Sequence, residues 1–93
     1  MSGIIGISYE RMDESKHNMS RALDAAQEEK NQLIIAESAL EVTGSHELRS
    51  AADAINDMIR KVNTRMDNIE RVMASIDYSI RRFQEVDEQI ASR

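Results

Sequence analysis

Apolar side chains recur in alternating steps of four and three residues along the whole second half of this chain. The series runs through Leu48, Ala52, Ile55, Ile59, Val62, Met66, Ile69, Met73, Ile76, Ile80, Phe83, Asp87 and Ile90, and only Asp87 is not apolar. This spacing puts every member on one narrow stripe of an α-helix, as in the a and d positions of a coiled coil. The segment 46–91 is therefore predicted to be one long helix whose stripe needs a partner helix.

The remaining composition favours a single small helical domain. The chain has 93 residues, no Pro, no Cys and three Gly, and only 3% of its residues are aromatic. A chain of this length holds one domain, and without Pro few positions can interrupt a helix. The absence of Cys excludes a disulfide-stapled mini-domain, a cysteine nucleophile and a thiolate metal site. The net charge of −5 argues against nucleic-acid binding, because that function needs a basic surface.

Glycine and serine mark the ends of two predicted helices. Ser8 is a candidate N-cap for a first helix over about 9–42. In the turn 43–45, Gly44 suits the left-handed position that follows a helix, and Ser45 suits the next N-cap. The predicted fold is an all-α antiparallel two-helix hairpin in one domain, 1–93, with a longer second helix over about 46–91. Because one thin seam stabilises a hairpin poorly, we expect pairing with a second hairpin into a four-helix bundle.

The first helix carries a weaker apolar pattern. Its heptad row contains Met12, Met19, Ala26, Leu33 and Leu40, and the alternate positions are assigned to Ser15, Ala22, Glu29 and Ala36. We expect the hairpin seam and the partner interface to be formed by Met12, Met19, Leu33, Ile34, Ile35, Leu40, Ile55, Ile59, Val62, Met66, Ile69, Met73, Ile76 and Ile80. Ile34 and Ile35 adjoin Leu33 and so point to other faces of the helix. Met58 lies off the main seam, and we expect it to form a second contact stripe near these two isoleucines.

The C-terminal turns of the second helix contain a ring and a carboxylate on one face. Folding about Gly44 places Ser8 opposite Arg81, so residues 82–93 are expected to project beyond the first helix. Phe83 and Asp87 share a helix face in this segment because they lie four residues apart. From the residues alone two interpretations stay open. The pair is either an exposed element that a partner recognises, or a frayed helix end that tolerates a polar residue.

The whole chain resembles a family of small secretion partners. An acidic helix–turn–helix that ends in Phe83-Gln84-Glu85-Val86-Asp87 is similar to the WXG-like partner proteins of the Gram-positive type VII secretion system. More closely, it resembles the LXG-toxin-associated α-helical proteins (Lap proteins) of the type VIIb branch. That group has an F-x-x-x-D motif near the C-terminus, which Phe83 and Asp87 match. The chain has no Trp, so the W-x-G signature of the wider superfamily is absent.

The resemblance implies a targeting factor, or export chaperone, that binds the helical LXG domain of a toxin. Phe83 and Asp87 would form an export motif that the secretion machinery reads. The implied partners are the toxin, a second small helical protein and the type VII secretion ATPase, and a homodimer in isolation stays open. Neither nucleic-acid binding nor membrane insertion is expected. No signal peptide is recognised, so we expect the chain in the cytoplasm or exported with its cargo through the type VIIb system.

No residue pattern predicts chemistry. His17 and His46, the two histidines, lie on different predicted helices and near opposite ends of the first one, so they do not converge on a metal ion. Adjacent carboxylates such as Asp13 and Glu14 point about 100° apart on a helix, so they do not form a catalytic pair. We therefore expect no catalytic residues, no cofactor and no metal. The alternative function is a self-associating cytoplasmic coiled-coil scaffold or adaptor unrelated to secretion, which the seam favours equally.

Overall fold

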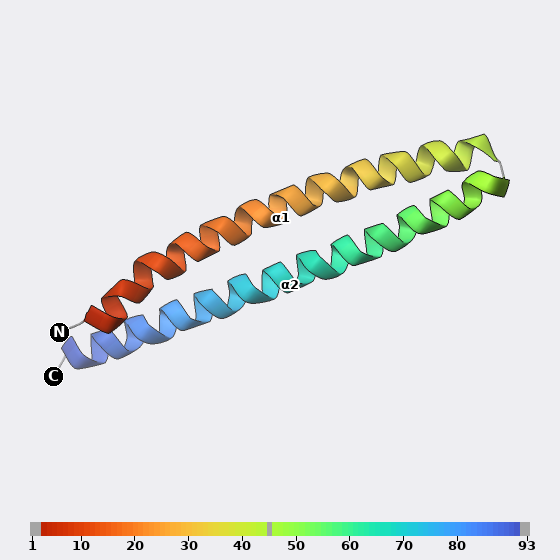
Figure 1. Cartoon of the computed structure of the whole chain (residues 1–93). Coiled ribbons are helices and arrows are strands. Elements are labelled where there is room, and N and C mark those ends of the chain that lie inside the picture. The colour runs from red at the N-terminus through yellow and green to blue at the C-terminus, as the bar shows by residue number, and fades with distance from the viewer. Residues whose placement is uncertain (1–2, 45, 92–93) are drawn as a thin grey trace.

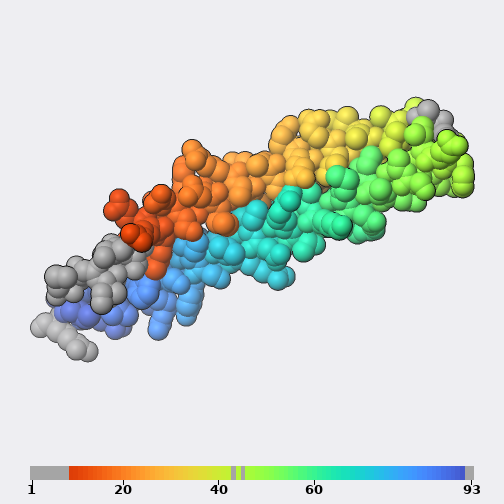
Figure 2. Space-filling model, in the orientation of Figure 1, coloured from red at the N-terminus to blue at the C-terminus, as the bar shows by residue number. Residues whose placement is uncertain are grey.

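Two long antiparallel helices make up the hairpin shown in Figure 1. The computed structural model describes residues 3–44 and 46–91, and the side chains of 9–42 and 46–91. Helix α1 spans Gly3–Thr43 and helix α2 spans His46–Ala91, and the two pack against each other along their length. The hairpin measures 72 × 15 × 15 Å, so it is a rod only two helices thick (Figure 2). The predicted all-α hairpin is confirmed.

The turn depends on the backbone of Gly44. Its φ is +68°, in the left-handed region that glycine adopts without strain, and its N–H donates a 3.3 Å hydrogen bond to the carbonyl oxygen of Glu41. Gly44 is therefore the residue that ends α1, as the sequence predicted. Ser45, the predicted N-cap of the second helix, lies outside the described residues.

Burial in α2 follows the predicted seam. Each seam position from Leu48 to Asp87 is buried or half-buried, and Ile90 at the end is exposed. Among the described side chains, however, the fully buried hydrophobic ones are few and small: Ala26, Ala52 and Val62. The core is thus a single line of contacts between two helices, with no third layer over it.

The alternate seam positions predicted for α1 are wrong in the half of the helix nearer the turn. There Glu29 and Ala36 are exposed, whereas Lys30 and Glu37, each one residue further along, are half-buried. In the other half, the predicted Ser15 and Ala22 are half-buried, and so are Lys16 and Leu23 beside them. The seam of α1 runs through Tyr9, Met12, Lys16, Met19, Leu23, Ala26, Lys30, Leu33, Glu37 and Leu40. Its polar members can lie there because long side chains pack their aliphatic stems and keep their charged ends in water.

The two helices pair in a different register from the predicted one. Helix α1 begins at Gly3, so Ser8 lies inside the helix and is not its N-cap. Ion pairs join Lys16 to Asp77 and Glu29 to Arg65. Each of these α1 side chains therefore meets a residue of α2 that lies further towards the C-terminus than a count outward from Gly44 predicts. This shift arises because side chains tilt towards the N-terminus of their own helix, which is away from the turn in α1 and towards it in α2.

The expected C-terminal projection is therefore wrong. The turns of α2 that contain Phe83 and Asp87 lie beside the first turns of α1, and the start of α1 and the end of α2 lie at the same end of the rod in Figure 1. Phe83 and Asp87 consequently belong to the helix–helix contact and do not stand free of it.

Candidate functional site

Phe83 and Asp87, the predicted export motif, lie against Tyr9 of α1 at the end of the rod away from the turn. The Tyr9 hydroxyl donates a hydrogen bond of 2.8 Å to Oδ2 of Asp87. The Tyr9 ring meets the Phe83 ring edge to face, with ring centroids 6.4 Å apart and an interplanar angle of 81°. All three side chains are half-buried. We call these three residues the Tyr9 cluster.

The seam pattern explains why these residues meet. Phe83 and Asp87 occupy successive seam positions of α2, and Tyr9 is the first seam position of α1 that the structure describes. A carboxylate turned towards an apolar seam needs a hydrogen-bond donor, and Tyr combines an apolar ring with such a donor. Sequence reasoning missed Tyr9, although it lies three residues before Met12 and thus on the seam spacing.

The electrostatics of the cluster keep Tyr9 in its neutral form. Partial burial of the side chain, the hydrogen bond to Asp87 and the negative charge of Asp87 together raise the pKa of Tyr9 from 10.0 to about 12. The hydroxyl therefore stays protonated well into the alkaline range and acts as the donor to the carboxylate. Asp87 is thus half-buried and held by Tyr9 of α1, so it neither projects free of the hairpin nor lies in a frayed helix end.

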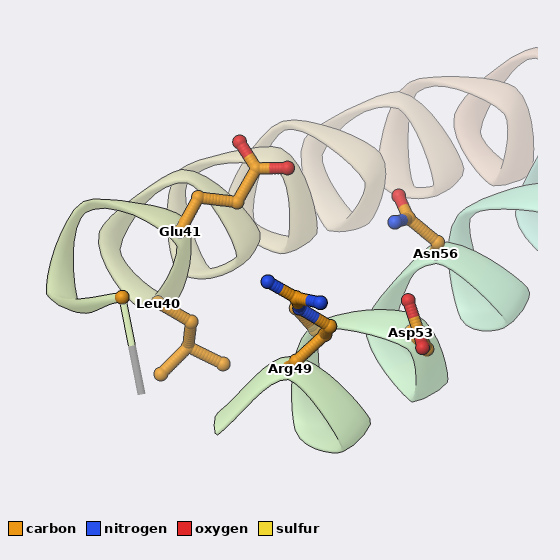
Figure 3. Close-up of a pocket in the computed structure, with 7 residues that line it drawn as sticks. Leu40, Glu41, Arg49, Asp53 and Asn56 are labelled. Carbon is orange, nitrogen blue, oxygen red and sulfur yellow. The ribbon is translucent and has the colours of Figure 1, made fainter. Parts of the chain in front are cut away.

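The turn end of the rod holds a shallow polar hollow (Figure 3). It has a volume of about 350 Å³ and is lined by Leu40, Glu41, Gly44, Arg49, Ala52, Asp53 and Asn56. The Arg49 guanidinium points into the space between the helices. The Glu37 carboxylate, one turn earlier, can accept a hydrogen bond from the protonated Glu41 side chain and repels its ionised form, so the pKa of Glu41 is raised above its usual value. In the described part of the chain, His, Cys, Asp and Glu form no group of three or more that could hold a metal ion.

The two long sides of the hairpin differ in polarity. The ion pair between Glu29 and Arg65 shows that the heptad rows of these residues meet on one side, which we call the apolar side. Its rows are Ser15, Ala22, Glu29 and Ala36 of α1 and Ala51, Met58, Arg65, Val72, Ser79 and Val86 of α2. The opposite side, which we call the polar side, has the rows Asp13, Ser20, Gln27, Ile34 and Glu41 of α1 and Arg49, Asn56, Asn63, Glu70, Asp77 and Gln84 of α2.

The two sides also show that the second contact stripe expected for Met58 and the two isoleucines is wrong. Met58 lies on the apolar side, whereas Ile34 lies on the polar side, so the two do not share a contact stripe. Ile34 and Ile35 are exposed and take no part in the seam. Met12, Met19, Leu33 and Leu40 are half-buried in the seam of α1, as expected.

Comparison with known proteins found no matching family model, no similar characterised protein and no similar solved structure. Within the described ranges, neither helix combines the length and the apolarity that crossing a membrane requires.

Proposed function

We propose that this chain is a small helical targeting factor, or export chaperone, that binds the helical LXG domain of a type VIIb secretion toxin. In this proposal its C-terminal Phe83 and Asp87 supply the export signal. The chain binds and delivers its cargo and carries out no chemistry. A second small helical protein and the secretion ATPase are the further partners.

The thin core is the observation that carries the proposal. Among the described side chains only Ala26, Ala52 and Val62 are fully buried hydrophobic residues. At the same time Met58, Val72 and other large apolar side chains are exposed. A two-helix rod of this kind gains stability when further helices cover its apolar surface, as they do in helical bundles.

The Tyr9 cluster supports the second part of the proposal. The edge-to-face ring contact and the hydrogen bond to Tyr9 hold Phe83 and Asp87 in one geometry at the end of the rod. Val86 and Ile90, on the neighbouring turns, are exposed. A fixed aromatic ring and carboxylate beside exposed apolar residues suit recognition by a protein partner.

Two variants separate the export signal from toxin binding. Asp87→Asn removes the charge but keeps an oxygen that can accept the Tyr9 hydrogen bond, and Phe83→Ala removes the ring. We expect both variants to bind the LXG domain in a pull-down and to lose toxin export, measured by immunoblot of the culture medium. Loss of binding in either variant would refute this separation of roles.

Tyr9→Phe is the matched control. It breaks the hydrogen bond to Asp87 but keeps the ring contact with Phe83 and the carboxylate itself, so export should fall only in part and by less than in Asp87→Asn or Phe83→Ala. Export that fails in Tyr9→Phe to the same degree would mean that the motif only fixes the hairpin end. If the wild-type chain forms a homodimer that ignores the LXG domain, the alternative of a self-associating scaffold is favoured.

A further inference from the structure

The apolar side contains a shallow groove near the Tyr9 cluster. The groove has a volume of about 320 Å³ and is lined by Met12 of α1 and by Arg71, Val72, Ser75, Ile76 and Ser79 of α2. Val72 is 43% exposed although it is a large apolar side chain. Met12 and Ile76 are seam residues, so the groove continues the core of the hairpin to the surface.

The charges around this groove differ in sign from those of the whole chain. Arg71 lines the groove itself. In this half of the hairpin, the heptad rows that flank the apolar side are Arg11, Asn18 and Ala25 of α1 and Asn68, Ser75 and Arg82 of α2, all exposed, and their charged members are both basic. Between the Glu29–Arg65 ion pair and the Tyr9 cluster, the described residues of the apolar side and of its flanking rows include no carboxylate. The net charge of −5 is instead concentrated elsewhere, and the polar side with its flanking rows carries Glu10, Asp13, Asp24, Glu41, Asp53, Asp67, Glu70, Asp77 and Glu88.

We infer that this half of the apolar side receives an amphipathic helix of the partner whose apolar stripe is flanked by acidic residues. The identity of that partner rests on the proposed function, and the chemistry of the helix follows from the surface. Apolar residues of the incoming helix pack on Met12, Val72 and Ile76. Its flanking carboxylates face Arg11 and Arg82, since complementary charges at the rim of an interface select the partner and set its orientation.

A second copy of the chain fits this surface poorly. Two copies that both use this half of the apolar side place one basic rim against another, and like charges across an interface are unfavourable. The groove therefore favours a different chain, which agrees with a heteromer and not with a homodimeric scaffold.

Two synthetic helices test the surface directly. Each is about three heptads long with Leu at the a and d positions, and the flanking positions are Glu in one peptide and Lys in the other. Binding to the full chain is measured by fluorescence anisotropy at low and at high salt. We expect the Glu peptide to bind at least about tenfold more tightly than the Lys peptide, with the difference shrinking at high salt.

Paired substitutions locate the binding site. Val72→Asp on the apolar side should weaken binding of the Glu peptide by about tenfold or more, and Ile34→Asp, at a site of 41% exposure on the polar side, should not. Arg82→Glu should weaken binding by several-fold, whereas Arg81→Glu, which lies in a row flanking the polar side, should not. Circular dichroism of each variant confirms that the hairpin remains folded.

The outcomes separate this inference from the proposed function. Equal binding of the two peptides, or equal effects of Val72→Asp and Ile34→Asp, overturns the inference. The same variants are then assayed with the LXG domain of the toxin. If that domain binds and Val72→Asp has no effect, the proposed function stands and the inference fails. If only the Glu peptide binds, and does so at Val72, the surface stands and the proposed partner is wrong.

Discussion

The Tyr9 hydroxyl and Oδ2 of Asp87 lie 2.8 Å apart although 78 positions separate the two residues in the chain. This hydrogen bond joins the first turns of α1 to the last turns of α2, at the end where the hairpin has no covalent connection. It also gives Asp87, the one carboxylate of the α2 seam, a hydrogen-bond donor in the Tyr9 hydroxyl. The proposed export motif is therefore part of the helix pair that presents it.

Breaking this hydrogen bond should loosen the end of the rod and leave its centre unchanged. We expect Tyr9→Phe to speed amide hydrogen exchange several-fold in the last turns of α2, with no change around Val62, because local opening reflects local contacts. Tyr78→Phe removes the hydroxyl of an exposed tyrosine and serves as the control. Equal acceleration along the whole helix would show that the contact is not local.

The ionisation of Tyr9 should report its contact with Asp87. In Tyr78→Phe the chain keeps Tyr9 as its single tyrosine, so absorbance at alkaline pH follows that group alone. The pKa of Tyr9 is raised to about 12. Adding Asp87→Ala should lower it only part of the way towards 10.0, because burial, the largest cause of the shift, remains.

The raised pKa of Tyr9 also predicts how the stability of the hairpin changes with pH. The folded-state pKa of Tyr9 lies above its ordinary value, so the stabilisation from this residue is complete below pH 10.0 and is lost as the pH rises to about 12. Thermal unfolding across this range should show a steeper loss of stability in the wild type than in Tyr9→Phe. Parallel curves would contradict the assignment.

The turn should tolerate only residues that accept a left-handed backbone. Gly44 has a φ of +68°, and a Cβ added there meets no atom within 4 Å, so the cost of a side chain is conformational and not steric. We expect Gly44→Ala to destabilise the hairpin by about 1 kcal/mol and Gly44→Asn by less. Chemical denaturation measures both, and an Ala variant as stable as the wild type would contradict this account of the turn.

The apolar pattern was enough to predict which residues of α2 face the seam, but it predicted those of α1 only in part. Nearly all the seam positions of α2 are apolar, so the pattern has one possible phase. In α1 the seam includes Lys16, Lys30 and Glu37, which interrupt the apolar pattern, while Ala22 and Ala36 lie one residue away and imitate it. Which residues of α1 face α2 is therefore known only from the burial and the ion pairs in the structure.

The candidate site was predicted only in part. Phe83 and Asp87 stood out in the sequence because Asp87 is the one polar position of the α2 seam. Their environment was missed because the pairing register depends on the direction in which side chains tilt, and a count outward from Gly44 does not include that tilt. Tyr9 was missed for the same reason, since the predicted register left it opposite no member of the motif.

A polar seam residue in α1 should be replaceable with a gain in stability. Glu37 is half-buried on the seam, and its carboxylate raises the pKa of Glu41 one turn further along. We expect Glu37→Leu to stabilise the hairpin by about 1 kcal/mol, because it adds an apolar contact to the seam and removes the carboxylate that repels Glu41. Glu28→Leu, at an exposed position, should change stability by less than about 0.5 kcal/mol. Equal effects of the two substitutions would place Glu37 outside the seam.

The proposed function requires that the hairpin bind a toxin domain of a different sequence. The experiment is to co-express the chain with an LXG toxin domain, purify the product, and determine its mass by light scattering. The account predicts a stable heteromer that contains both chains and that Val72→Asp weakens. A homodimer of this chain alone, unchanged by the presence of the toxin domain, would contradict it.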